Sequence, residues 1–447
     1  MSHLQQATHL LIERSGNLAT SLQAEYPRLA QLLTELHRGM TLVPIEVLYV
    51  VVMFAAASLI VGAFVFPLSG FSTYVERRVA GRIQARIGCN RVGPEGLLQF
   101  LADGIKLFTK EDNIPLGADR VLFRLAPYLV VLGALLSFVC IPFGKYLYVA
   151  DLNVGLFYLI SISSLVVVGI LLAGWSSNNK WSLLGAMRSA AQMISYEIPV
   201  ALALMVPILL AGTFSLVELN RIQAGGMRHW IVFAAPPAAL IALVVYFISS
   251  LAETNRTPFD LPEAESELVS GYNTEYSGMR WGLFFVAEYA NMFLVSAIAV
   301  TAFLGGWQPS RSNIVFATGA FFFTFILAIK SLTFFIQLVL GLLRGQKLFF
   351  LLSNVRPVKF KKWWFGAIAG ISILLATALQ MLFADVWFVT FLMFVAKVYF
   401  VVFVMMWIRW TLPRIRIDQM MALCWKKLVP IAFGCVFWTA LFMIARG

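Results

Sequence analysis

The sequence predicts an all-α membrane protein: a polytopic transmembrane helical bundle with amphipathic helices at the membrane interface. Of its 447 residues, 60% are hydrophobic and 13% are charged, which leaves too little polar surface for a fold surrounded by water. The apolar residues form recurrent runs of about 20, enough to cross roughly 30 Å of hydrocarbon as a helix. These runs do not alternate between polar and apolar residues, which excludes a transmembrane β-barrel.

About ten runs are long enough to cross the membrane. They lie at about 45–68, 122–143, 153–175, 191–212, 231–251, 281–304, 313–340, 364–383, 386–410 and 428–445. If the connection at 69–121 is cytoplasmic, 24 of the 34 Lys and Arg residues lie on the cytoplasmic side and eight on the other, in keeping with the positive-inside rule. This orientation puts both termini outside. It also explains the net charge of +12 by topology rather than by nucleic-acid binding.

Amphipathic helices are predicted outside the spans. Over 75–87, apolar residues recur at every fourth position beside a stripe of arginines, the pattern of a basic helix lying in the interface. A second such helix is expected after Pro94, where apolar residues within 97–108 share one face. Leucines at helical spacing within the N-terminal extension, residues 1–44, predict a surface helix.

The stretch 253–280 carries the strongest functional signal. Six of the chain's 22 acidic residues lie in these 28 positions, between two apolar runs. Carboxylates crowded beside a bilayer repel one another and resist desolvation, so the arrangement is costly unless the site handles protons or charge.

Further ionisable residues lie inside the predicted spans. Glu197 and Glu288 each lie about two turns from the cytoplasmic end of a span, roughly 10 Å deep at about 1.5 Å per residue, and Lys397 lies near the middle of another. A charge at such depth costs roughly 2.5–3.5 kcal/mol unless it is paired or hydrated. A structural ion pair would explain one such residue, and it is the better interpretation of Lys330. Together with the acidic stretch, the others predict a hydrated chain of carboxylates that passes protons or charge into the membrane.

No pattern in the sequence predicts a metal site, a disulfide framework or a cleavable secretory signal. The four cysteines are scattered, without a CxxC pair or a nearby histidine. Residues 1–20 have neither a basic start nor a continuous apolar core.

The motifs in the polar connections resemble one family closely. They are Glu76-Arg77-Arg78, the run from Gly88 to Pro94, the run from Ala102 to Glu111, Ser176 to Trp181, Ser195 to Pro199, Ala252 to Arg280, and Leu412-Pro413-Arg414 with Asp418-Gln419. In length and order they are similar to those of the quinone-chamber membrane subunit of complex I, the proton-translocating NADH:quinone oxidoreductase. The resemblance covers roughly 45–305 and 386–446.

The resemblance divides the chain into four segments. The N-terminal extension at 1–44 precedes a family membrane core at 45–305, which carries cytoplasmic quinone-chamber loops at 69–121 and 253–280. Residues 306–385 are then an inserted transmembrane hairpin, expected to pack at the periphery against lipid or an accessory subunit. Residues 386–447 hold the C-terminal family spans. One departure lies in the first loop, where Cys89 stands at a position that is commonly proline in the family.

The function implied by the resemblance is that of one component of a respiratory translocase. Such a component forms the quinone entry tunnel and couples quinone reduction to proton translocation in the bacterial cytoplasmic (inner) membrane. It has no redox centre or metal of its own. Ubiquinone or menaquinone is the substrate, and NADH, FMN and the iron–sulfur clusters belong to partner subunits. The expected partners are the hydrophilic quinone-site and terminal-cluster subunits, together with small and antiporter-like membrane subunits.

The resemblance also assigns roles to individual residues, none of them catalytic on this chain alone. The quinone chamber would be lined by Glu76, Arg77, Arg86, Arg256, Phe259, Asp260, Glu263, Glu265 and Glu267. The path for protons or charge would run through Asp103, Glu197, Glu253, Glu275, Glu288 and Lys397. Structural charges would be Arg280, Arg409 and Arg414.

Chemistry agrees with this assignment, and two other functions compete with it. Reducing a quinone consumes two electrons and two protons, and the transiently basic product needs donors or positive charge near its oxygens, which arginines supply without titrating. One alternative is the related subunit of a membrane-bound hydrogenase or formate-hydrogen lyase. The other, of a different class, is a stand-alone ion antiporter. The intact Glu76-Arg77 motif and the stretch 253–280 favour the quinone form.

Overall fold

The computed structural model describes residues 65–261, 268–308 and 387–446. The chain divides into two compact units, 1–64 and 65–447, and every described residue belongs to the second. The described residues form helices joined by irregular connections, with no strand among them. The predicted all-α fold is therefore confirmed. Four predictions lie outside the described residues: the N-terminal surface helix, the spans at 313–340 and 364–383, and the setting of Lys330.

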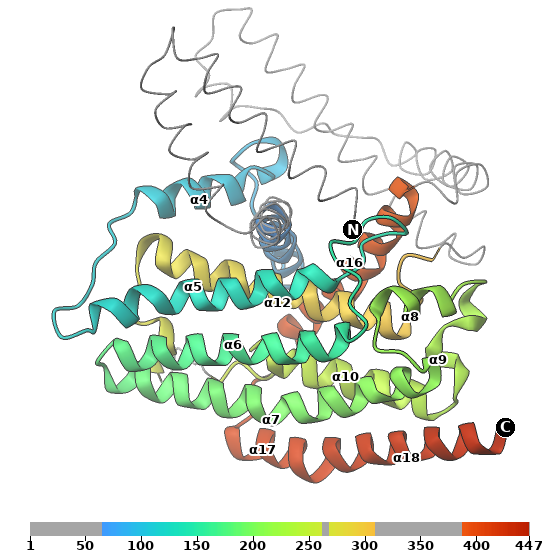
Figure 1. Cartoon of the computed structure of the whole chain (residues 1–447). Coiled ribbons are helices and arrows are strands. Elements are labelled where there is room, and N and C mark those ends of the chain that lie inside the picture. The colour runs from blue at the N-terminus through green and yellow to red at the C-terminus, as the bar shows by residue number, and fades with distance from the viewer. Residues whose placement is uncertain (1–64, 262–267, 309–386, 447) are drawn as a thin grey trace, which may run out of the picture. The chain divides into compact units, whose positions relative to one another are not determined.

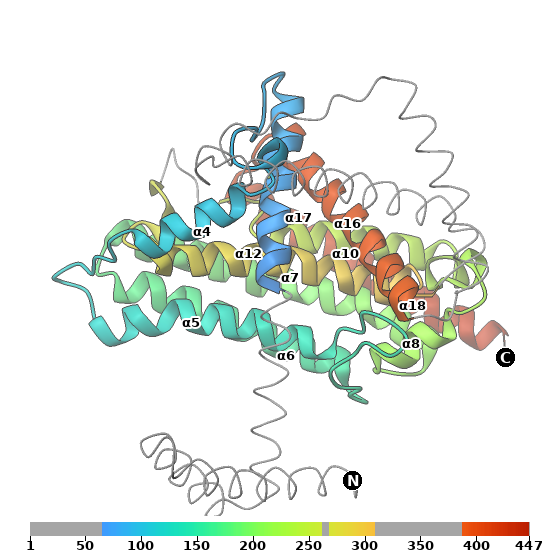
Figure 2. The ribbon, with the colours of Figure 1, turned by 90° about the horizontal axis from the view of Figure 1, so that it is seen from above.

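Five helices form the core of the bundle. They are α5 (Arg120–Ser137), α6 (Gly155–Ser176), α7 (Lys180–Ala211), α10 (Ala238–Glu253) and α12 (Gly278–Phe303). Figures 1 and 2 show α5, α6 and α7 running side by side, and α6 packs against both of its neighbours. The most enclosed helix is α12, because it packs against α5, α10, α16 and α4.

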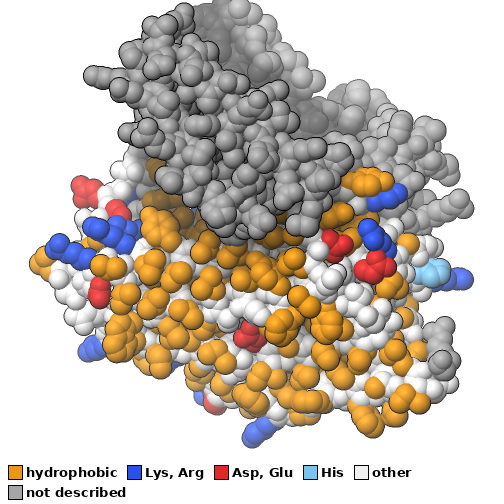
Figure 3. Space-filling view, viewed as in Figure 1, with side chains coloured by type: hydrophobic (Ala, Val, Ile, Leu, Met, Phe, Trp, Pro, Cys, Tyr) orange, Lys and Arg blue, Asp and Glu red, His pale blue; other side chains and the backbone are white. Residues whose placement is uncertain are grey.

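The last helices complete the bundle. α16 (Trp387–Thr411) packs on α12, and it is followed by α17 (Ile417–Leu423), a π-helical turn (Cys424–Leu428) and α18 (Val429–Arg446). α18 lies along α7 and α10, below them in Figure 1. In the described part of the chain, six helices are long and apolar enough to cross a membrane, and α10 is a shorter apolar helix. Figure 3 shows apolar side chains covering most of the described face, with most charged ones near its margins.

The short elements lie in the connections. They are η1 (Pro94–Gly96), α4 (Gln99–Thr109), η2 (Phe138–Cys140), α8 (Leu216–Ile222), η3 (Met227–His229), α9 (Ile231–Ala234) and η4 (Gly271–Asn273). The second predicted amphipathic helix is present as α4. Its residues Leu101, Ile105 and Phe108 are exposed, while the helix itself packs beside the start of α12.

The connections gather at two ends of the bundle. At one end, which we call the basic end, the connections 110–119, 177–179 and 412–416 contact the described parts of a further connection, 254–261 and 268–277. Asp119 N donates to Ser176 O at 3.0 Å, and Ile415 N donates to Pro258 O at 3.0 Å. At the opposite end Ser215 Oγ donates to Asp151 Oδ1 at 2.7 Å. The described loops that the positive-inside rule assigned to the same side thus lie together.

Two predicted spans have different limits. The span predicted at 191–212 begins at Lys180, because the Asn179 side chain accepts a hydrogen bond from the Trp181 N–H and starts the helix. The span predicted at 231–251 is divided into α9 and α10. Pro236 and Pro237 lie between them, and neither has an N–H to continue the helical hydrogen bonds.

The first predicted amphipathic helix ends at residue 83, before its predicted end at 87. The helix runs over 65–83 without a break after the predicted end of the first span. It stops because Ala85 adopts a left-handed backbone conformation with φ 53°. Arg86 and Ile87, which were predicted to lie on this helix, therefore belong to the following turn.

The contact between α6 and α7 depends on Gly174. A Cβ atom at this position would lie 2.3 Å from Ala186 Cβ and 2.8 Å from Ser182 O, so we expect Gly174→Ala to separate the helices and destabilise the protein by about 1–3 kcal/mol. The melting temperature of the purified protein measures this. Gly434→Ala on α18, where the added Cβ meets nothing within 4 Å, is the matched control. Equal melting temperatures for the two variants would contradict the close contact.

Candidate functional site

A buried carboxylate, Glu76, lies at the centre of the candidate site. It belongs to the helix at 65–83 and is only 3% exposed. Arg409 pairs with its Oε1, Arg256 Nη1 lies 3.2 Å from its Oε2, and Tyr289 donates a 2.6 Å hydrogen bond to Oε2. Burial acts to raise the pKa of Glu76, but Arg256 and Arg409 outweigh it and hold this pKa below its ordinary value of 4.5.

Arg256 joins this carboxylate to a second one, Glu288. The guanidinium is 2% exposed and lies 4.3 Å above the ring of Tyr289. Its Nε is 3.0 Å from Glu288 Oε1, an ion pair without the angle of a hydrogen bond. Its Nη2 has no hydrogen-bond partner among the described residues. Arg256 therefore has a donor to spare at the centre of the site.

The four charges of this cluster balance. Glu76, Arg256, Glu288 and Arg409, which we call the charge cluster, come from the helix at 65–83, the turn after α10, α12 and α16. Two carboxylates face two guanidinium groups, so the formal charges of the set cancel. Glu76 and Arg256 are its buried members, and removing either charge would leave the other uncompensated in a low-dielectric interior, a change that costs roughly 3–5 kcal/mol for a buried pair.

A second ion pair lies beside the cluster on the same turn. Arg414 Nη2 is 3.5 Å from Asp260 Oδ2, while Asp260 Oδ1 is buried and has no hydrogen-bond partner among the described residues. Burial raises the pKa of Asp260, and the charge of Arg414 offsets only part of that rise. The preceding residue, Phe259, is buried against the ring of Tyr196 with centroids 5.5 Å apart. Asp260 thus accepts a proton more readily than an exposed aspartate.

Two more carboxylates approach each other inside the bundle. Ser163 donates a 2.8 Å hydrogen bond to Glu197 Oε1. Ser163 also lines a cavity of about 20 Å³, together with Glu253 and Asn291, which is room for about one water molecule. Asn291 lies on α12 three residues after Glu288, so both share one face of that helix. Polar side chains from α6, α10 and α12 therefore meet at this cavity, and Ser163 links it to Glu197.

Comparison with known proteins identifies the family. A sequence profile described as NADH dehydrogenase matches residues 46–352 and 359–440. The NADH-quinone oxidoreductase H subunit of Anaeromyxobacter dehalogenans is 46% identical over 88% of this chain and 82% of its own length. The chain belongs to this family. Proteins of the same name from Chlorobium luteolum and Bacteroides fragilis are 44% and 41% identical, over 84% and 89% of this chain and 84% and 92% of their own lengths.

The family confirms the resemblance found in the motifs. This member of the family is a membrane component of the multisubunit NADH-quinone oxidoreductase, complex I. Of the residues that the resemblance placed in the quinone chamber, Glu76, Arg256, Phe259 and Asp260 lie together. Glu263, Glu265 and Glu267 lie outside the described residues.

Three of the expected residues belong to a separate part of the basic first loop. Arg77 Nη1 pairs with Asp103 Oδ2 at 2.6 Å, and Gln99 also donates to Asp103. Arg86 is exposed and donates to Gln84 at 2.6 Å. None of these contacts reaches the charge cluster, so Asp103 pairs locally with an arginine one residue from Glu76 in sequence.

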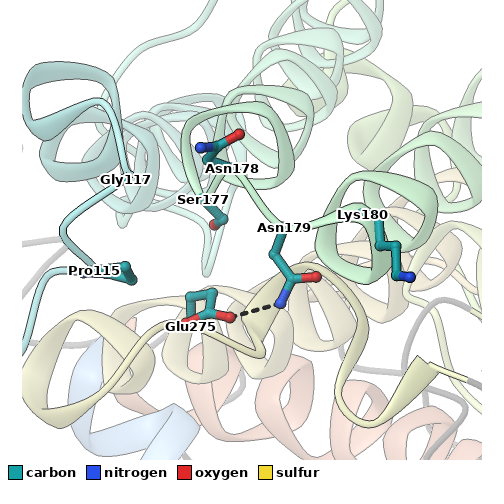
Figure 4. A pocket seen from close by; sticks show the side chains of 7 residues that line it. All are labelled: Pro115, Gly117, Ser177, Asn178, Asn179, Lys180 and Glu275. Atoms are coloured by element: carbon teal, nitrogen blue, oxygen red, sulfur yellow. Dashed lines mark hydrogen bonds between the residues drawn. The ribbon is translucent and has the colours of Figure 1, made fainter.

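Glu275 lies in a different pocket of this complex I component. Figure 4 shows it at the basic end, where it accepts a 2.6 Å hydrogen bond from Asn179, the N-cap of α7. The pocket holds about 480 Å³ and also includes Lys180. Glu197 lies 17 residues farther along α7, roughly 26 Å at about 1.5 Å per residue. Nearby, Arg280 Nη2 pairs with Asp112 Oδ2 at 3.0 Å.

Lys397 has a setting unlike that of the carboxylates. Its Nζ donates to the carbonyl oxygens of Leu304 and Gly306 at 3.1 and 2.9 Å and lies 4.8 Å from the ring centroid of Trp230. These carbonyls follow the end of α12, where the helix dipole favours a cation. Leu304 is 16 residues beyond Glu288, roughly 24 Å along the helix. Lys397 is therefore held at the opposite end of α12.

Three residues of the site were absent from the sequence-based assignment: Tyr289, Ser163 and Asn291. Tyr289 follows Glu288 directly in the chain, and its hydroxyl reaches Glu76 only because the helix at 65–83 packs there. The available signal for Ser163 and Asn291 was their polarity within apolar runs, since a polar group in a spanning helix needs a partner.

Glu76 and Asp260 are expected to affect stability in opposite ways. The lowered pKa of Glu76 means that its charged form stabilises the fold above pH 4.5, and that this contribution is lost as pH falls through its folded-state pKa. The raised pKa of Asp260 makes its charged form a cost at neutral pH.

We therefore expect Glu76→Gln to lower the melting temperature at pH 7, with a loss of roughly 3–5 kcal/mol, and Asp260→Asn to lower it far less. Thermal unfolding of the purified complex at pH 7 and at acid pH measures both changes. The deficit of Glu76→Gln should shrink at acid pH, where the wild-type carboxylate also takes up a proton. A deficit that does not depend on pH would contradict the role of the charge.

Proposed function

We propose that this chain forms the inner end of the quinone tunnel of complex I and couples quinone reduction to proton translocation. The observation that carries the proposal is the neutral charge cluster beneath the turn at 254–261. Arg256 Nη2 and Asp260 Oδ1 are buried without hydrogen-bond partners among the described residues. Buried polar groups are nearly always paired, so a free donor and a free acceptor on one turn suit a polar head group such as that of a quinone.

The cluster offers a physical link between quinone charge and protonation. A reduced quinone carries negative charge before it takes up protons, and this charge would attract Arg256 and weaken its pair with Glu288. Glu288 would then lose the cation that stabilises its ionised form and would take up a proton, since burial disfavours an unpaired carboxylate. When the quinol is protonated and leaves, Arg256 returns to Glu288 and the proton is released.

The released proton has a route into the bundle. From Glu288 the polar groups continue through Asn291 and the one-water cavity to Glu253, and then through Ser163 to Glu197. We place Glu275, Asp103 and Lys397 outside this route, because their hydrogen-bond partners lie elsewhere. The proton path proposed here therefore contains three of the six residues that the resemblance assigned to it and adds two polar neighbours.

The remaining features follow from complex I as a whole. The chain would act as one component of a translocase in the cytoplasmic membrane, with the basic end on the cytoplasmic side. NADH, FMN and the iron–sulfur clusters would be held by partner subunits docked at that end. The relatives named above are NADH-quinone oxidoreductase subunits, and we therefore prefer this function to that of a hydrogenase subunit or a stand-alone antiporter.

Replacing Arg256 by alanine tests the quinone site. Arg256→Ala should lower NADH:quinone reductase activity by on the order of 10²-fold, because a misplaced reactant commonly costs that much. Oxidation of NADH by ferricyanide, which occurs at the flavin of a partner subunit, should persist. Arg221→Ala is the matched control, since Arg221 is exposed and pairs with Glu218 at the opposite end. Equal loss of both activities in Arg256→Ala would indicate failed assembly instead.

Replacing Glu288 by glutamine tests the proton path. Glu288→Gln keeps the size of the side chain but cannot take up and release a proton, so both proton pumping and quinone reduction should fall. Proton uptake by reconstituted vesicles, measured together with NADH oxidation, gives the ratio of protons to electrons. Glu218→Gln at the opposite end should leave both rates unchanged. Wild-type coupling in Glu288→Gln would remove this residue from the path.

A further inference from the structure

One buried amide on α7, that of Gln192, holds the turn that carries Arg256. Gln192 is fully buried, and its Nε2 lies 2.8 Å from Ala252 O, 2.8 Å from Phe259 O and 3.1 Å from Asn255 Oδ1. Ala252 comes before Arg256 and Phe259 comes after it. A single side chain therefore draws together the two ends of the turn.

One residue of the turn has a left-handed backbone conformation. Asn255 has a φ of 51°, which asparagine adopts more readily than most residues with a side chain. The side chain of Asn255 donates to Ser189 Oγ at 3.3 Å. Ser189 precedes Gln192 by three residues and lies on the same face of α7. Gln192 and Ser189, on one face of α7, thus both contact the turn, and both hydrogen-bond to Asn255, the residue before Arg256.

The turn has backbone hydrogen bonds of its own, among them Arg256 N to Leu251 O at 3.2 Å and Phe259 N to Arg256 O at 2.8 Å. These bonds join residues close in the chain, whereas Gln192 joins both ends of the turn to α7. Ile415 N donates to Pro258 O at 3.0 Å, and this bond fixes the far side of the turn. The Arg256 side chain contacts Glu76, Glu288 and the ring of Tyr289. A competing anion would weaken these contacts. If the amide of Gln192 is removed, buried acceptors at Ala252, Asn255 and Phe259 lose a donor at once.

We propose that Gln192 is a positioning residue for Arg256: its amide fixes the turn so that the guanidinium reaches Glu76, Glu288 and an incoming quinone head group. This inference rests on the proposed function. Gln192 acts through Arg256 and does not itself touch the substrate. The same helix carries Tyr196, which packs on Phe259, and Glu197 one residue later. The turn and the inner carboxylate path are therefore anchored on one segment of α7.

The test uses the assembled complex with Gln192→Met, which keeps the length of the side chain and removes the donor. The expected result is a rise in the KM for a short-chain quinone of about tenfold, since small displacements of a binding group have effects of this order. NADH:ferricyanide activity and the amount of assembled complex should stay near wild type. An unchanged KM would overturn the inference.

Gln223→Met is the matched control. Gln223 is also fully buried and also donates to two carbonyls, those of Leu219 and Thr301, at 3.1 and 2.9 Å, but it lies at the opposite end of the bundle. Its loss should reduce the stability of the complex without changing the KM for quinone. If both variants raise the KM equally, Gln192 has only a general structural role and the inference is wrong.

Combining Gln192→Met with Arg256→Ala shows whether the two residues act together. Without an arginine to position, the further loss of the amide should change the residual activity by less than about twofold. Independent, multiplying effects would overturn the inference. If Arg256→Ala alone leaves quinone reduction intact, the proposed function fails. If it lowers quinone reduction while Gln192→Met does not, only the inference fails.

Gln192→Asn covers the case in which Gln192→Met does not assemble. It keeps the donors but is shorter by one methylene, so it should raise the KM by a smaller factor. If neither variant assembles while Gln223→Met does, Gln192 is a folding determinant and the positioning role is rejected.

Discussion

The structure depends on the neutralisation of one buried carboxylate. Glu76 is nearly inaccessible to water, and an isolated ionised carboxylate in such a place is strongly unfavourable. Its two cationic partners lie 180 and 333 residues farther along the chain. The helix at 65–83, the turn after α10 and helix α16 must therefore meet at one point before the charge is satisfied. This requirement selects one arrangement of helices whose apolar surfaces alone would permit several.

The sequence predicted the helices well and the contacts between them poorly, for a physical reason. Apolar runs and basic connections report on the membrane, which acts on each segment separately. As a result α5, α6 and α12 lie close to their expected limits, and α16 ends close to its expected end. The predicted helix limits were wrong where individual polar side chains or prolines determine where a helix begins or ends. The N-cap at Asn179 extends α7, and the prolines at 236 and 237 divide a run that is continuous in hydropathy.

The same difference between single residues and the contacts among them applies to the candidate site. The motifs marked Glu76, Arg256 and Glu288 as unusual, but no local pattern states that one arginine bridges the two carboxylates. The resemblance assigned Asp103, Glu275 and Glu197 to one path. In the structure Asp103 pairs with Arg77, and Glu275 accepts a hydrogen bond from Asn179. Spacing along a chain carries no information on which of several carboxylates faces a given cavity.

Lys397 fixes α12 at a second point, and this limits how the helix can move. The helix spans 26 residues, about 39 Å. Arg256 contacts the helix near its middle, at Glu288 and Tyr289, and the ammonium group of Lys397 binds the carbonyls that follow its last residue. A helix held at both of these points resists sliding along its own axis. The backbone of α12 is therefore a fixed frame from which the side chains of Glu288 and Tyr289 project.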